Sequence, residues 1–132
     1  MKKTVLVIDP DREHLLEITR SWQSQPWRTI TVPTLEEAID VLSDTGVDMI
    51  IAAEELNWLN GSEFLRLTHH RYPQMIRVLI TEEPDLIWNW SEPLCFHAES
   101  RIHFATSLPC TSECVVNAIY DLFGLEPVTM VR

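Results

Sequence analysis

Acidic side chains follow an apolar run near the start of the chain. Residues 4–8 are branched or aliphatic, and Asp9, Pro10 and Asp11 come directly after them. Two carboxylates at the end of a strand suit one of two kinds of chemistry. They can help to hold a hard cation such as Mg²⁺, or they can act as a nucleophile and a general acid.

Further apolar runs along the chain are expected to form the strands that position these groups. The first run, residues 4–8, has the branched and aliphatic composition that is typical of a strand buried on both sides of a parallel sheet. The expected strands cover residues 4–8, 28–32, 47–53, 76–81 and 102–105.

Segments with helical periodicity separate the expected strands. Thr34 and Glu37 form a capping box at the start of one helix, and Gly124 is placed to end the last one. Residues 84–99 predict at most a short or broken helix, because Pro84 and Pro93 bracket part of this stretch. The expected helices cover 12–24, 34–43, a segment around Phe64 that ends before Pro73, and 111–124.

Strands that alternate with helices through short connections predict a doubly wound parallel sheet of five strands, with helices on both faces. We expect one domain over residues 1–124, and a tail or the start of a linker over 125–132. In such sheets the functional crevice lies at the carboxyl ends of the strands. The residues expected there are Asp9–Asp11, Ala53–Leu56, Thr81, Glu82 and Thr106–Pro109.

Composition narrows the class of partner. The formal net charge is −10, and no cluster of lysines and arginines occurs along the chain. This argues against nucleic-acid and membrane binding, which need several cations to neutralise phosphates. No apolar stretch approaches the roughly 18 residues that a membrane span requires. We therefore expect a cytoplasmic protein with a neutral or basic protein partner.

Four segments of the chain resemble bacterial receiver domains of response regulators. These are V-L-V-I-D in the first strand, E-E-A-I-D-V-L in the second helix, D-M-I-I-A-A-E-E-L-N-W-L-N-G-S-E-F-L around the third strand, and R-Y-P-Q-M-I-R-V-L-I-T at the fourth. Receiver domains take a phosphoryl group from the histidine of a sensor kinase onto an aspartate. The resemblance covers nearly the whole chain, and it implies a flavodoxin-like, CheY-like α/β/α fold and a role in two-component signalling.

The chain departs from the receiver pattern at the positions that perform phosphoryl transfer. The first acidic position of the family falls on Asp9, but the second falls on Pro10, which has no side-chain oxygen. The acceptor position lies five residues after Asp48 and eight before Gly61, and both counts give Ala53. An alanine cannot be phosphorylated.

The switch positions of the family are also altered. Leu108 stands where the family has a lysine that pairs with the phosphate, and Ala105 replaces the switch aromatic. Thr81 is the switch residue that is retained. Glu54 could substitute for the acceptor or mimic a phosphate, but one step along a strand turns its side chain to the opposite face.

We therefore expect a degenerate receiver that works without phosphorylation, is not an enzyme, and needs neither a cofactor nor a metal. The expected partner is an output domain, a sensor kinase, a second receiver or a second copy of the chain. Trp58, Trp88 and Trp90 are the candidate partner-binding residues, because tryptophan is enriched at binding hot spots.

Two alternatives stay open. The chain could be a conventional receiver with an altered acidic site, in which Asp9 and Glu54 respond to phosphate or Mg²⁺. More remotely, Asp9 and Asp11 match the D-x-D spacing of haloacid-dehalogenase-type phosphatases, although Arg12 and Glu13 do not continue that pattern.

Overall fold

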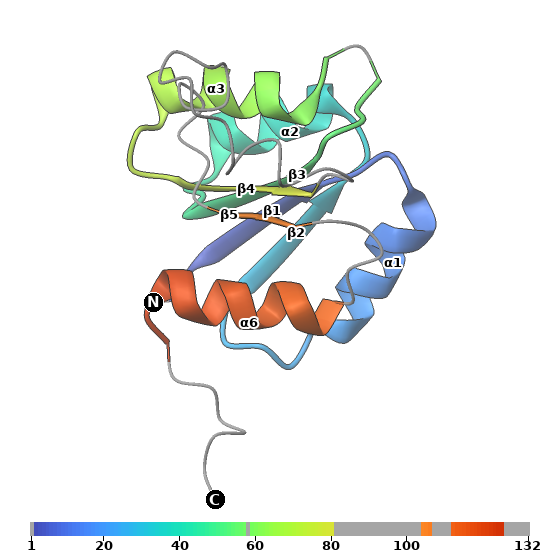
Figure 1. The fold of residues 1–132 in the computed structure, drawn as a ribbon, viewed down its shortest axis with the longest axis vertical. Coiled ribbons are helices and arrows are strands. Elements are labelled where there is room, and N and C mark those ends of the chain that lie inside the picture. Colours follow the sequence, from blue (N-terminus) through green and yellow to red (C-terminus); the bar gives the residue numbers. More distant parts are fainter. Residues whose placement is uncertain (1, 58, 81–103, 107–111, 126–132) are drawn as a thin grey trace, which may run out of the picture.

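The chain folds into a five-stranded parallel sheet between two layers of helices (Figure 1). The computed structural model describes residues 2–57, 59–80, 104–106 and 112–125. The strands are β1 (Thr4–Ile8), β2 (Arg28–Val32), β3 (Met49–Ala53), β4 (Ile76–Ile80) and β5 (Phe104–Thr106), in the order β2-β1-β3-β4-β5. The helices are α1 (Arg12–Ser21), α2 (Leu35–Asp44), α3 (Gly61–Arg71) and α6 (Ser112–Phe123).

A separate apolar core lies on each face of the sheet. Helices α2 and α3 cover one face, and α1 and α6 cover the other (Figure 1). Strand β3 serves both cores, because successive side chains alternate between faces: Ile50 and Ala52 pack toward α2 and α3, and Met49 and Ile51 toward α1 and α6. The prediction that the strand at residues 4–8 is buried on both sides is confirmed, because all five residues of β1 are buried.

Helix α1 is shorter than its sequence pattern predicts. The helix expected over 12–24 ends at Ser21. The N–H of Trp22 still donates to the Ile18 carbonyl at 2.9 Å, but the indole then packs edge-on against Trp27, with 5.8 Å between ring centroids. Trp22 continues the apolar periodicity of the helix, so that pattern does not mark where the helix ends.

Strand β3 begins later than predicted, at Met49 rather than at residue 47. The Asp48 carboxylate accepts a hydrogen bond from the Thr4 N–H at 2.8 Å, and the Asp48 N–H donates to the Thr4 carbonyl at 2.9 Å. The Asp48 side chain thus takes the place of a backbone carbonyl as hydrogen-bond acceptor where β1 and β3 begin to pair.

Local signals at the helix ends act as predicted. The Glu37 N–H donates to the Thr34 hydroxyl at 3.2 Å, which caps α2. Gly124 has a φ of 70°, and the N–H of Leu125 donates to the Tyr120 carbonyl at 2.8 Å. This six-to-one bond with a left-handed glycine is the Schellman pattern, and it ends α6.

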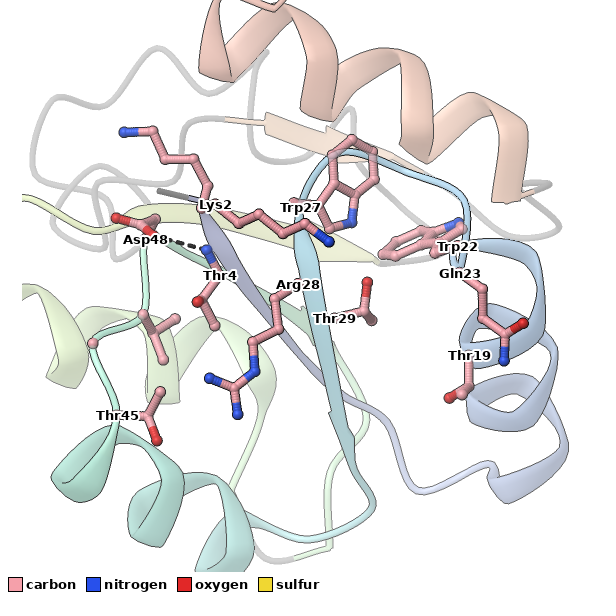
Figure 2. Close-up of a pocket in the computed structure, with 13 residues that line it drawn as sticks. Lys2, Thr4, Thr19, Trp22, Gln23, Trp27, Arg28, Thr29, Thr45 and Asp48 are labelled. Atoms are coloured by element: carbon pink, nitrogen blue, oxygen red, sulfur yellow. Dashed lines mark hydrogen bonds between the residues drawn. The ribbon is translucent and has the colours of Figure 1, made fainter.

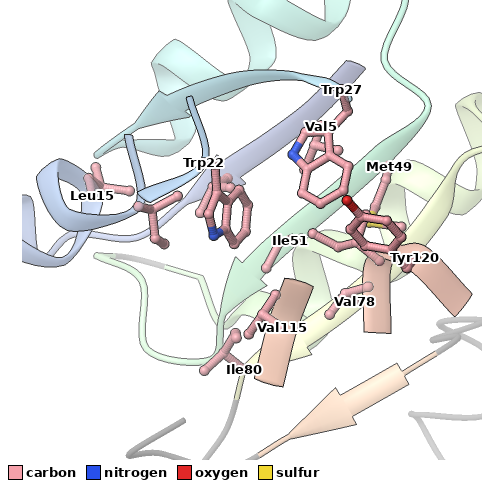
Figure 3. Close-up of a cluster of buried hydrophobic side chains, with 13 residues drawn as sticks. Val5, Leu15, Trp22, Trp27, Met49, Ile51, Val78, Ile80, Val115 and Tyr120 are labelled. Carbon is pink, nitrogen blue, oxygen red and sulfur yellow. The ribbon is translucent and has the colours of Figure 1, made fainter. Parts of the chain in front are cut away.

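Three aromatic rings join the loop after α1 to helix α6 within the core (Figure 3). The rings of Trp27 and Tyr120 meet edge-on, with centroids 5.5 Å apart. The Tyr120 hydroxyl also donates to Gln25 Oε1 at 2.8 Å.

No helix within the described ranges is long and apolar enough to cross a membrane.

Candidate functional site

The carboxyl ends of β1 and β3 bring Asp9 and Ala53 to one narrow cavity. Its volume is about 10 Å³, which is room for roughly one water molecule. His14 and Ile80 also line it, and most of the remaining lining is apolar. Among the residues that line this cavity, the acidic group is Asp9.

The start of α3 fixes Ala53 in this position. A Cβ atom built on Gly61 would lie 2.1 Å from the Ala53 carbonyl oxygen and 2.9 Å from its carbon. The helix can therefore approach the end of β3 this closely only with glycine at residue 61. The Gly61 N–H also donates to the Glu54 carbonyl at 2.8 Å.

Asp9 is engaged by neighbours in the chain. Its Oδ1 accepts from the Asp11 N–H at 2.9 Å, and its Oδ2 lies 2.6 Å from His14 Nδ1. The side chains of His14 and Asp9 are 25% and 14% exposed. The hydrogen bond to Asp9 raises the pKa of His14, against the opposing effect of burial, and the negative charges of Asp9, Glu17 and Asp11 raise it further. A protonated His14 neutralises Asp9 and weakens its attraction for a divalent cation.

His14 is the site residue that sequence reasoning missed. Its partner Asp9 precedes the helix, so helical periodicity does not connect the two residues. The one hint in the sequence is that Asp11 can cap a helix whose first turn then holds His14 close to the end of β1.

Asp11 does not point into the cavity as a second acid. It is the N-cap of α1, and its Oδ1 accepts from the N–H groups of Glu13 at 3.1 Å and His14 at 3.2 Å. Pro10 is exposed between the two aspartates. In the phosphatase alternative Asp11 would be the general acid, but here it serves as a helix cap.

Glu54 faces helix α3. Its carboxylate accepts from the Ser62 N–H at 3.0 Å and from the Ser62 hydroxyl at 3.3 Å. It is not among the residues that line the cavity with Asp9 and Ala53. This is the orientation that strand alternation predicts.

Several predicted site residues lie outside the part of the chain that the structure describes. These are Thr81, Leu108, Trp58, Trp88 and Trp90. Ala105 is within β5, paired in register with Leu79. In the described ranges, no group of three or more histidine, cysteine, aspartate and glutamate side chains is placed to hold a metal ion.

The pair formed by His14 and Asp9 predicts a pH-dependent stability. Because the folded pKa of His14 lies above its ordinary value of about 6.5, the pair stabilises the fold fully below that pH, and the contribution is lost as pH rises through the folded pKa. We expect wild type to exceed His14→Gln in free energy of unfolding by roughly 1 kcal/mol at pH 5.5, and the difference to vanish at high pH. Urea unfolding of both proteins across pH 5.5 to 9 checks this, since the other histidines are common to both. A difference that grows with pH would contradict the pairing.

Comparison with known proteins was made by sequence and by structure. No protein-family model matches the chain. The chain is 31% identical over 87 residues to the hydrogenase transcriptional regulatory protein HoxA of Cupriavidus necator, a match that covers 64% of this chain and 18% of HoxA. The chain thus spans under a fifth of that regulator's length.

Superposition on solved structures identifies the fold. A CheY-like response regulator receiver domain of Methanospirillum hungatei superposes with a TM-score of 0.78 at 16% identity, covering 92% of this chain and 94% of that one. This is the receiver-domain fold. The BeF₃-activated receiver domain of DrrB, a protein of Thermotoga maritima, superposes with a TM-score of 0.76 at 18% identity, covering 94% and 99%. The predicted flavodoxin-like, CheY-like architecture is confirmed.

Proposed function

We propose that this chain is a phosphorylation-independent receiver module of two-component signalling that acts by binding another protein. The observation that carries the proposal is Ala53 at the end of β3, held there by the close approach of Gly61. In the receiver fold this position is the one from which an aspartate would accept phosphate. A methyl group has no oxygen to form an acyl phosphate.

The surroundings of Ala53 support the same conclusion. Pro10 supplies no ligand oxygen, and the charge of Asp9 is met by His14 at 2.6 Å rather than left free for Mg²⁺. Glu54 caps α3 through Ser62 and does not line the cavity. A receiver that cannot be switched by phosphate can still present its surface to a partner.

The partner classes remain those predicted from the sequence. They are an output domain, a sensor kinase, a second receiver or a second copy of the chain. The module would bind any of these through a complementary surface, without catalysing a reaction. HoxA, which the chain matches in part, is named as a transcriptional regulator, so an output domain that acts on transcription is one form this partner could take. Direct binding of nucleic acid or membrane by this module is not part of the proposal, because the formal net charge of −10 opposes it.

Titration with Mg²⁺ and beryllofluoride tests the proposal. We expect no saturable change in backbone amide shifts at millimolar concentrations, because the cavity lacks the carboxylates that hold the ion and accept the phosphate analogue. The DrrB receiver, whose structure was solved in a BeF₃-activated state, is the positive control. A saturable response centred on Asp9 and Glu54 would contradict the proposal and favour a receiver with an altered acidic site.

A variant with the missing carboxylates restored shows whether the titration could detect Mg²⁺ binding in this fold. Pro10→Asp combined with Ala53→Asp places three carboxylates around the carboxyl edge, including Asp9. We expect this double variant to bind Mg²⁺ with a dissociation constant on the order of millimolar, where wild type does not. The same titration, followed by amide shifts, checks both proteins.

A further inference from the structure

Strand β2 is an open edge of the sheet. It stands at one end of the strand order, and no strand within the described ranges pairs with its outer side. The Arg28 N–H donates to the Lys3 carbonyl at 2.8 Å, and the Asp9 N–H donates to the Val32 carbonyl at 3.2 Å. Residues 28 and 32 therefore direct their backbone groups toward β1, and so does residue 30 between them.

The backbone groups of Thr29 and Thr31 face the opposite way. In a parallel pair, alternate residues of a strand bond to one neighbour, so the N–H and carbonyl groups of these two threonines point out of the sheet. Natural edges of this kind are often blunted by charged side chains, proline or a bulge. Beyond Arg28 at its start, β2 has none of these: the sequence continues Thr-Ile-Thr-Val, and its register with β1 is unbroken. An edge left in this state is a template for one more strand.

Helices α1 and α2 border this edge on opposite faces of the sheet without covering it (Figure 2). Strand β1 is buried at every position, whereas Thr29, Ile30 and Thr31 are each partly exposed. The Thr31 hydroxyl lies 3.2 Å from the Thr19 hydroxyl of α1, and Ile30 packs against the core under α2 and α3. An added strand would therefore meet polar side chains on one face and an apolar side chain on the other.

The charge beside this edge is negative. Helix α2 carries exposed carboxylates and no lysine, arginine or histidine, in a chain whose formal net charge is −10. The carboxylates belong to Glu36, Glu37, Asp40 and Asp44. If a second copy paired its β2 with this one around a two-fold axis, the two α2 helices would lie side by side and their carboxylates would repel. A basic strand is attracted instead.

We propose that the β2 edge binds an extended segment of a partner protein, which adds one strand to the sheet and carries lysine or arginine beside β-branched residues. Its backbone pairs with Thr29 and Thr31, an apolar side chain lies beside Ile30, and its cations meet the carboxylates of α2. The inference rests on the protein-binding role proposed above and names the surface for it. A beryllofluoride response at Asp9 would contradict phosphorylation independence without changing this edge, so the two proposals fail separately.

A short peptide tests the edge in the intact chain. The probe is acetyl-Lys-Val-Thr-Val-Thr-Lys-amide, which repeats the alternation of β2 and is basic at both ends. We expect it to shift the Thr29 and Thr31 amide signals saturably in ¹H–¹⁵N spectra, with a dissociation constant on the order of 1 mM for so short a peptide. The absence of such shifts would overturn the proposal. So would shifts of these signals with protein concentration alone, which would assign the edge to a second copy.

Two control peptides separate backbone pairing from charge. One carries an N-methyl group on each central residue, which removes the backbone donors that a strand needs. The other has glutamate in place of both lysines. We expect each to bind roughly tenfold more weakly than the probe. Equal affinity for the N-methylated peptide would overturn strand addition, and equal affinity for the glutamate peptide would overturn the basic partner.

Two substitutions of Thr31 form a matched pair. Thr31→Pro removes an outward N–H and leaves the N–H groups that bond to β1, because proline is tolerated where the N–H faces out of a sheet. We expect it to weaken binding of the probe roughly tenfold, whereas Thr31→Val keeps the N–H and should bind like wild type. Unchanged amide signals from β1 show that both variants are folded. The proposal is overturned if Thr31→Pro binds like wild type, or if Thr31→Val binds as weakly as Thr31→Pro.

Discussion

Replacing Gly61 with alanine is expected to lower the free energy of unfolding by about 3 kcal/mol, at the upper end of the cost of overpacking. The added Cβ would lie 2.1 Å from the Ala53 carbonyl oxygen and 3.1 Å from Leu79 Cδ1. The nearest atoms belong to the backbone of β3, which is buried between two helical layers and cannot move as a surface side chain would. Relief therefore requires α3 to shift away from the sheet.

Gly46 offers a matched control for this substitution. A Cβ at Gly46 would meet nothing within 4 Å, and its backbone is not left-handed. We expect Gly46→Ala to change the free energy of unfolding by less than about 1 kcal/mol, with a slight gain from a less flexible unfolded chain. Urea unfolding of the two variants checks both values. If Gly61→Ala were as stable as Gly46→Ala, α3 would not be held against Ala53 in the way described.

Much of the sheet could be predicted because the type of each residue in a short run already indicates a strand. The limits of β1 and β2 agree with the predicted strands at 4–8 and 28–32. Ala53 and Glu54 were assigned to opposite faces by alternation alone, and the cavity lining and the contacts with Ser62 agree with this. These inferences succeed because side chains along a strand alternate strictly between its two faces. A strand buried in a parallel sheet also accepts few residue types other than apolar ones.

The interaction between His14 and Asp9 could not be predicted in the same way. It depends on a turn at the end of β1 and on Asp11 capping α1, and neither has a repeating pattern. Its distance of 2.6 Å is a result of tertiary geometry. An ion pair between a helical residue and a residue that precedes the helix leaves no trace in helical spacing.

A pocket at the edge of the sheet where β1 and β2 begin could not be predicted from the sequence either. Its residues come from four separate segments, and the expectation that function lies at the carboxyl ends directed attention to the other edge. The sequence shows no cluster of cations, yet folding brings Arg28 to the same pocket as Lys2 and Lys3.

Truncating Trp27 is expected to be the most damaging single change in the described core. Its ring is 3% exposed and meets Trp22 and Tyr120 edge-on, at centroid distances of 5.8 Å and 5.5 Å (Figure 3). We expect Trp27→Ala to lower the free energy of unfolding by about 4 kcal/mol, from lost apolar burial and the cavity left behind. Leu16→Ala, at a side chain that is 51% exposed, should cost well under about 1 kcal/mol.

A double-mutant cycle separates ring contact from simple burial. If the edge-on contact of Trp27 with Tyr120 stabilises the fold beyond apolar area, then Trp27→Leu and Tyr120→Leu together should cost less than the sum of the single changes by about 1 kcal/mol. Tyr120→Phe provides the control for the hydroxyl, which donates to Gln25 at 2.8 Å. Additive costs would mean that α6 is held by burial alone. A coupling of this size would mean that the loop after α1 and helix α6 stabilise each other through these rings.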